Sequence, residues 1–295
     1  MSRSVRKGWK RDAGVAKQER VPKFDAAGSH YAYRTGAAVG FWQAIKQSYR
    51  GSFAFLLACP LLALVPVAFE LVQHMVEVHI GLYDSVEAAK ALDGSPIRLA
   101  FGFLKTIGIM VPGYWVVRWL ATCDERFAAT FNPEAVRLFS FYLLVNVGLV
   151  AIQLFLLPRT GIASLIAFLA GEAIGVLFAA WAVGAALGNP RIGPVQSAAL
   201  MVRHFVWNFV FFVVAMLPLM AVHYAFAALA ILGPKLLLWP VLVVDSLLIA
   251  WLTALLIAIS YFAARRSADL EGVALTPGRH TVAVNELRRG GPGIS

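Results

Sequence analysis

Five ionisable side chains interrupt the long apolar stretches of this sequence: Glu70, Lys105, Glu172, His223 and Asp245. Inside a membrane span such a residue costs about 2.5–3.5 kcal/mol on insertion scales, so each one is a functional hypothesis by default. One lysine against three carboxylates predicts a partly neutralised cluster. A cluster of this kind can bind a cation, relay protons or hold a polar headgroup in a cavity that opens to the outside.

A second pattern surrounds Glu70. His74 and Glu77 follow it at spacings of four and seven residues, which places all three on one face of a helix, with Gln73 beside them. Carboxylate and imidazole groups suit several divalent metal ions. A closed metal site needs further ligands, however, and only His223 is an obvious candidate at similar depth. The spacing therefore favours a wet polar stripe leading from the outer surface towards Glu70, and we predict no metal ligand and no cofactor. The predicted pocket comprises Glu70, His74, Lys105, Glu172, His223 and Asp245.

The elements that carry these residues follow from composition. Hydrophobic residue types make up 60% of the 295 residues, charged types 14%, and the mean hydropathy is +0.72. Soluble domains are about 45–50% apolar and about 25% charged, so a soluble fold is excluded. A helix needs about 20 mostly apolar residues to cross a bilayer. Six stretches qualify: Ser52 to about Met75, Ile97 to Ala121, Leu138 to Leu157, Gly161 to Leu187, Phe205 to Leu232 and Leu236 to Ala263. We therefore predict an all-α, polytopic transmembrane bundle of six spans.

The distribution of basic residues predicts the orientation. With a cytoplasmic N-terminus, 21 of the 26 Lys and Arg residues fall on the inner side, four on the outer side and one, Lys105, within a span. The positive-inside rule then places both termini in the cytoplasm. In this topology all five intramembrane residues lie in the outer half of the bilayer, within about 10 Å of the midplane at 1.5 Å per residue.

Three regions are expected along the chain. Residues 1–36 carry many basic residues and no apolar run, which is typical of a disordered cytoplasmic arm rather than a signal peptide. Such an arm binds anionic lipid with about 1 kcal/mol per basic residue. A nucleic-acid tail is the alternative, but no binding motif supports it. Residues 37–265 form the membrane domain, and residues 266–295 form a cytoplasmic tail.

The spans show a weak internal repeat. Residues 63–68 align with residues 215–220 at an offset of 152, so that Pro66 and Pro218 correspond. Each proline removes a hydrogen bond in the middle of its span. An amphipathic segment precedes spans one and five, and a shorter one, starting at Asn132, precedes span three. We expect three parallel units, each an interfacial helix followed by a transmembrane hairpin.

This arrangement resembles the membrane domain attached to bacterial glycerophosphoryl diester phosphodiesterases, and related six-span bacterial membrane proteins. The closest stretch is Gly193 to Ala228, where a proline-started segment ending in Arg203 and His204 leads into an aromatic-rich span. The resemblance implies a bacterial inner-membrane location. The chain contains no phosphodiesterase domain, so that activity does not carry over.

Two functions compete. The first is transport, or the handling of lipid or a small polar solute, through the outer-leaflet pocket. The second is a non-catalytic scaffold or assembly subunit of a larger complex, which would hold its partners with the arm, the tail and the glycines of span four. We expect span four to lie at the centre of the bundle. No enzyme motif is present, and no enzymatic activity is predicted. The charged pairs also have two structural interpretations: they fix helix register, or they reach the headgroups by snorkelling.

Overall fold

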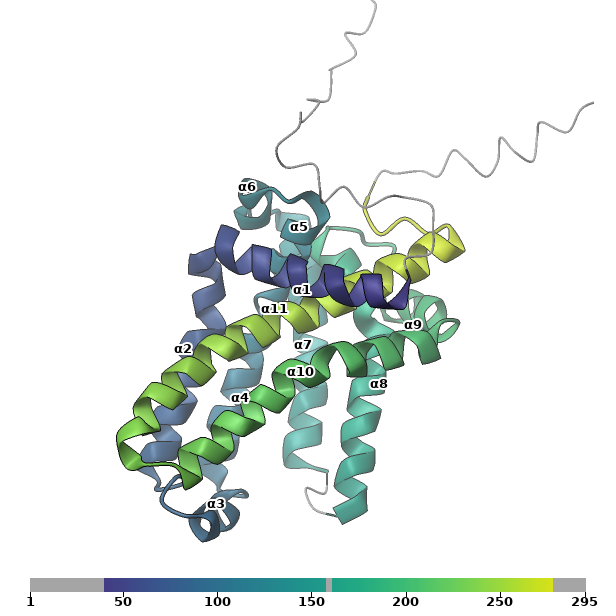
Figure 1. Ribbon diagram of the computed structural model, residues 1–295. Helices are drawn as coiled ribbons and strands as arrows, with labels where there is room; N and C mark the ends of the chain where they lie inside the picture. Colours follow the sequence, from purple (N-terminus) through teal and green to yellow (C-terminus); the bar gives the residue numbers. More distant parts are fainter. Residues whose placement is uncertain (1–39, 158–160, 278–295) are drawn as a thin grey trace, which may run out of the picture. The chain divides into compact units, whose positions relative to one another are not determined.

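The computed structural model describes residues 40–157 and 161–277, and in these residues it contains helices and no strand (Figure 1). Six helical segments are long and apolar enough to cross a membrane: Pro60–His79, Pro96–Thr122, Pro133–Phe155, Gly161–Ala186, Phe205–Leu232 and Lys235–Glu271. The predicted all-α bundle of six spans is confirmed, and the protein is a multi-pass membrane protein. The basic arm, the end of the C-terminal tail and the turn at residues 158–160 lie outside the described residues.

A helix outside the candidate spans precedes a pair of spans three times along the chain. These preceding helices are α1 (Phe41–Ala58), α6 (Glu125–Ala129) and α9 (Pro194–Val202). In the first pair, α2 (Pro60–His79) is followed by a span made of α4 (Pro96–Met110) and α5 (Gly113–Thr122). The second pair is α7 (Pro133–Phe155) with α8 (Gly161–Ala186), and the third is α10 (Phe205–Leu232) with α11 (Leu238–Glu271). The remaining elements are α3 (Val86–Leu92) and the 3-10 turn η2 (Lys235–Leu237).

The short helix of the second unit differs from the prediction. It begins after Asp124, whose carboxylate accepts hydrogen bonds from the backbone N–H groups of Arg126 and Phe127. Asn132, expected to start this short helix, instead caps the long helix α7 by accepting from the N–H of Ala135 at 3.1 Å. Both residues are good N-cap types, because their side-chain oxygens satisfy exposed N–H groups.

Two predicted span boundaries, the start of the first span and the end of the sixth, were wrong for backbone reasons, and the second span is divided within its predicted boundaries. The first span begins at Pro60 and not at Ser52, because α1 ends at Ala58 and a proline without an N–H group starts the next helix. The second span is divided at Pro112 into α4 and α5. The sixth continues to Glu271 and ends at Gly272, whose φ of +66° suits a residue without a side chain.

The central helix of the described part is α11, and not α8 as the glycines of span four suggested. The most apolar 18-residue window of the α11 span is 61% buried, against 11% for that of α8. Helix α11 packs against α1, α2, α5, α8 and α10. Two glycines of α8 contact neighbouring segments closely. A Cβ atom on Gly171 would lie 2.9 Å from Oε1 of Gln153, and one on Gly184 would lie 2.8 Å from Cβ of Ile192. Small residues therefore allow close packing without placing their helix at the centre.

One end of the bundle is covered by the segment between α2 and α4. Leu82 and Tyr83 of this segment form an apolar cluster with Ala230, Val241 and Leu242 of α10 and α11. The Lys235 ammonium group also donates a hydrogen bond to the carbonyl oxygen of Tyr83. The segment between α2 and α4 is thus a folded cap that contains α3 and contacts the hairpin of α10 and α11.

The contact between α2 and α4 yields a stability prediction. A Cβ atom on Gly108 would lie 2.4 Å from Cγ and Cδ2 of Phe69, whereas one on Gly148 of α7 would have no neighbour within 4 Å. We expect Gly108→Ala to destabilise the detergent-purified protein by about 1–3 kcal/mol through overpacking. Gly148→Ala, which adds only helix propensity, is expected to leave stability equal or raised. Thermal unfolding of both variants checks this, and an undiminished midpoint for Gly108→Ala would contradict the described packing.

Candidate functional site

Four of the intramembrane residues occupy matching positions along their helices. Glu70, Lys105 and His223 each lie nine residues from the end of a helix, at His79, Pro96 and Leu232, and Asp245 lies ten residues after Lys235. At 1.5 Å per residue these distances correspond to about 13–15 Å, close to half of a hydrocarbon core about 30 Å thick. The three helix ends and Lys235 belong to the same end of the hairpins, so the four side chains meet at one depth.

Two ion pairs join these residues across helix boundaries. The Lys105 ammonium of α4 lies 3.0 Å from Oε2 of Glu70 on α2, and Nδ1 of His223 on α10 lies 2.8 Å from Oδ1 of Asp245 on α11. Glu70 and Asp245 are 1% and 2% exposed, so both carboxylates depend on these partners. An unpaired carboxylate at such a position costs several kcal/mol.

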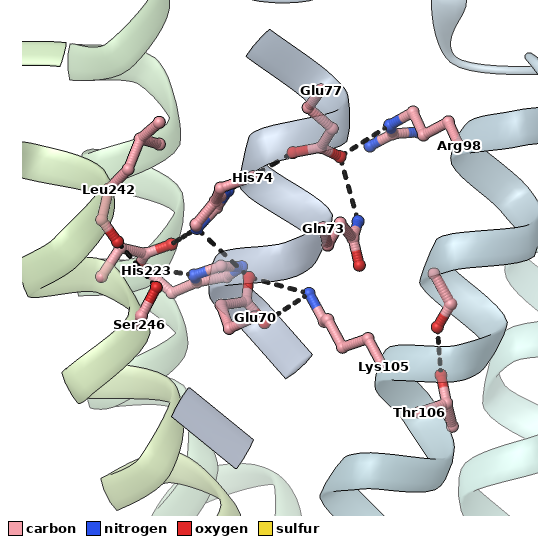
Figure 2. Close-up of polar contacts among 12 residues, drawn as sticks. Glu70, Gln73, His74, Glu77, Arg98, Lys105, Thr106, His223, Leu242 and Ser246 are labelled. Atoms are coloured by element: carbon pink, nitrogen blue, oxygen red, sulfur yellow. Dashed lines mark hydrogen bonds and ion pairs between the residues drawn. The ribbon is translucent and has the colours of Figure 1, made fainter. Parts of the chain in front are cut away.

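His74 joins the two ion pairs. Its Nε2 atom lies 3.4 Å from Oε1 of Glu70 and 3.3 Å from Oδ2 of Asp245. Its other ring nitrogen, Nδ1, lies 2.9 Å from the hydroxyl of Tyr83 and 3.4 Å from Oε2 of Glu77. Figure 2 shows His74 projecting from α2 between the side chains of α10 and α11 on one side and the glutamates of its own helix on the other. The imidazole is therefore in contact with three carboxylates.

Glu77 forms the outer part of the cluster. Its carboxylate accepts hydrogen bonds from Tyr83 at 2.6 Å, from Gln73 at 3.0 Å and from Arg98 at 3.0 Å. Arg98 also donates to the more exposed Asp93 at 2.7 Å. Burial raises the pKa of the Tyr83 hydroxyl above its usual range, and the charge of Glu77 raises it further. Tyr83 therefore keeps its proton and remains a donor to Glu77.

These side chains enclose a cavity of about 240 Å³ at the covered end of the bundle. Its polar lining comes from α2, α4, α10, α11 and the cap, and comprises Glu70, Gln73, His74, Glu77, Tyr83, Asp93, Arg98, Lys105, His223, Tyr224 and Asp245. Five of the six predicted pocket residues line it. The cavity has the size of several water molecules and is polar enough to hold them.

Glu172 is the predicted pocket residue that lies elsewhere. It lines a second cavity of about 550 Å³, formed by α4, α7 and α8. Gln73, Arg98 and Lys105 line both cavities. Glu172 thus shares the depth of the cluster but lies in the cavity beside α4 and α7, in the half of α8 that precedes its buried residues 176–186.

The cavity is lined by more carboxylates than fixed positive charges. Four carboxylates line the 240 Å³ cavity, those of Glu70, Glu77, Asp93 and Asp245, and the fixed cations among its lining residues are Arg98 and Lys105. When the four acids are ionised, the described lining is short of two positive charges. In a low-dielectric interior this deficit has to be met by protons on the imidazoles or carboxylates, or by a bound cation.

Sequence reasoning missed Tyr83 and Arg98 and did not single out Asp245 as the neighbour of His74. Tyr83 lies in the cap, four residues beyond the end of α2, and nothing in the spacing predicted that the cap would fold back. Arg98 was counted only as a basic residue of the outer side. Asp245, and not His223, places an oxygen beside Nε2 of His74, whereas His223 contacts Asp245 from behind.

Comparison of the chain with protein-family models, with curated proteins and with solved structures found no match. The resemblance to the membrane domain of the phosphodiesterases stays a prediction. Any functional argument therefore rests on the site itself.

The Glu70–Lys105 pair gives a prediction about stability. Lys105→Met removes the ammonium group and leaves the Glu70 carboxylate buried without its cation, which we expect to cost about 3–5 kcal/mol. Adding Glu70→Gln in the same chain removes the orphaned charge and should restore most of the loss. Lys90→Met on α3, where the side chain is exposed, serves as the control. Thermal unfolding in detergent measures all three, and a double variant no more stable than Lys105→Met would argue against this pairing.

Proposed function

We propose that this membrane protein transports a small polar solute that carries positive charge, with the cavity beneath the cap as its binding pocket. The observation that carries the proposal is the polar cavity at the depth of the hydrocarbon core, lined by ionisable groups of four helices. Ionisable residues gathered at that depth typically mark a substrate or ion pathway. A structural role for the charges requires only paired groups, and gives no reason for a cavity between them.

The charge of the pocket supports a cationic solute. The carboxylates of Glu70 and Asp245 face the cavity, and the lining is short of positive charge when its acids are ionised. A solute with a positive group meets this deficit on binding, and a proton taken up by the pocket meets it when the solute leaves. Exchange of the two is a physical route to coupling between solute and proton movement.

The second cavity supports a path through the protein. It shares Gln73, Arg98 and Lys105 with the pocket, so that movement of these three side chains is sufficient to join the two spaces. Lysine and arginine side chains are long and rotate readily, which suits them to such a role. Glu172 then lies on the path from the pocket and not in the pocket itself.

The proposal includes the cellular setting. The excess of basic residues on one side of the spans supports cytoplasmic termini, and the resemblance supports a bacterial inner membrane. The pocket would then open to the outside. The basic arm would bind anionic lipid, and the proposal assigns the protein no enzymatic reaction, no cofactor and no nucleic-acid partner. A scaffold or assembly subunit of a larger complex remains the competing function.

Water access to the cavities separates the two functions. In a background of Cys59→Ala and Cys123→Ala, a cysteine at Gly102 would face the second cavity, where an added Cβ has only Gln73 at 4.0 Å. We expect a charged, membrane-impermeant thiol reagent to label Gly102→Cys from one side of the membrane. Ala170→Cys, on an exposed face of α8 that lipid covers, should stay unlabelled. An unlabelled Gly102→Cys in folded protein would favour the scaffold.

Transport itself is tested on proteoliposomes adsorbed to a solid-supported membrane. We expect a transient current when one class of cationic solute is added, with organic amines, basic amino acids and divalent cations applied in turn. Asp245→Asn, reconstituted at the same protein amount, should lose the current because the variant removes a charge of the pocket. Absence of any current with every class in the wild-type protein would count against transport of a cation.

A further inference from the structure

We infer that Glu70, His74 and Asp245 form a binding site for one divalent first-row transition-metal ion. The inference goes beyond the proposed function, because binding of an ion at equilibrium requires no transport. These three buried residues place one ligand atom each within 4.8 Å of one another. A cluster of acids alone would not carry the inference, and the position of His74 adds the observation that does.

The hydrogen bonds around His74 determine which of its nitrogens is available. Tyr83 has one hydroxyl proton, and it goes to Glu77 across the shorter distance of 2.6 Å. The contact of 2.9 Å between the Tyr83 oxygen and Nδ1 of His74 therefore requires Nδ1 to be the donor. With the proton on Nδ1, the neutral ring presents the lone pair of Nε2 to the other side, which is the tautomer that a metal ion needs.

Nε2 of His74 is buried and makes no hydrogen bond with the described residues. It points between Oε1 of Glu70 at 3.4 Å and Oδ2 of Asp245 at 3.3 Å. Two carboxylate oxygens beside the same ring nitrogen require a positive species there, and either a proton on Nε2 or a metal ion between the three atoms supplies it. Ligand atoms at about 2.0–2.2 Å from a metal ion are separated from one another by about 3.0–3.5 Å, which matches both distances.

Each of the three proposed ligand residues is contacted by a further polar side chain, as is typical of metal sites. Lys105 contacts both oxygens of the Glu70 carboxylate, at 3.1 Å from Oε1 and 3.0 Å from Oε2, as Figure 2 shows. His223 holds Oδ1 of Asp245, and the Tyr83–Glu77 pair holds Nδ1 of His74. Outer groups of this kind fix the orientation of metal ligands and the tautomer of a ligating histidine. Each ligand residue thus has an outer partner. Nε2 of His74 lies beside Oδ2 of Asp245 and beside Oε1 of Glu70, which also accepts the hydrogen bond from Lys105.

The donor set decides the class of ion. One imidazole nitrogen with two carboxylate oxygens suits Zn²⁺, Mn²⁺, Fe²⁺ or Co²⁺, whereas Ca²⁺ and Mg²⁺ prefer oxygen alone and Cu⁺ prefers sulfur. Two positive charges are also the number by which the ionised lining of the 240 Å³ cavity is short. Water in the 240 Å³ cavity is available to complete the coordination.

Zinc binding by the detergent-purified, tag-free chain tests the inference. After removal of metal with a chelator, the protein is dialysed against increasing Zn²⁺ and its metal content is measured by mass spectrometry. We expect one Zn²⁺ per chain at the site, with an affinity at least tenfold lower in His74→Ala, Glu70→Gln and Asp245→Asn. His79→Ala is the matched control, because His79 lies on the same helix but is exposed on another face.

Two further measurements make the outcome decisive. His223→Ala, which removes only an outer partner, should lower the affinity by about tenfold. Zn²⁺ should raise the unfolding midpoint of the wild-type protein and of His79→Ala, since a ligand that binds only the folded state stabilises it.

Equal zinc affinity in wild type and His74→Ala would overturn the inference. If the ligand variants do not fold, an unchanged wild-type midpoint at saturating Zn²⁺ would overturn it as well. Absence of any current in a wild-type protein that binds zinc would instead count against transport alone.

Discussion

The cost of placing charge inside an apolar bundle governs how α2, α4, α10 and α11 pack. Glu70 and Asp245 are almost completely buried, and neither has a partner of opposite charge on its own helix except the titratable His74 of α2. Each carboxylate therefore has to be paired across a helix boundary, with Lys105 of α4 or His223 of α10. The register of four helices follows from these pairs, since a shift of one turn would move a charge about 5 Å from its partner.

The same constraint explains the cap. Glu77 lies near the end of α2, where a bare helix end would leave its carboxylate between lipid and water. The cap supplies Tyr83, and the first turn of α4 supplies Arg98, so that Glu77 has three donors. The apolar cluster around Leu82 and the bond from Lys235 to the Tyr83 carbonyl hold the cap on the hairpin of α10 and α11. Folding of the cap and formation of the site are therefore one event.

The sequence predicted correctly those features of the site that depend only on distance along a helix, above all the depth of a residue within its span. The depth of Glu70, Lys105, His223 and Asp245 required only span ends and the rise per residue, and the structure brings these four together. Glu172 has the same depth, but depth does not specify the direction around the bundle axis, and α8 presents it to a different cavity. The contacts of Tyr83 depend on how a connecting segment folds back, which helical periodicity does not describe. The start of the first span was misplaced because Pro60 divides an unbroken apolar run, and the break at Pro112 inside the second span was not predicted.

The repeat gives a reason for the location of the site. Glu70 and Lys105 come from the first unit and His223 and Asp245 from the third, while the second unit contributes Glu172 to the adjoining cavity. Helices α2 and α10 occupy equivalent places in their units and both flank α11, and Pro66 and Pro218 lie four and five residues before Glu70 and His223. An acid and an imidazole thus stand at nearly equivalent positions of two repeats. In transporters built from repeats, substrate sites lie at the interface between the repeats near the bilayer midplane. A site at such an interface changes whenever one unit moves against the other, which a scaffold does not need and a carrier does.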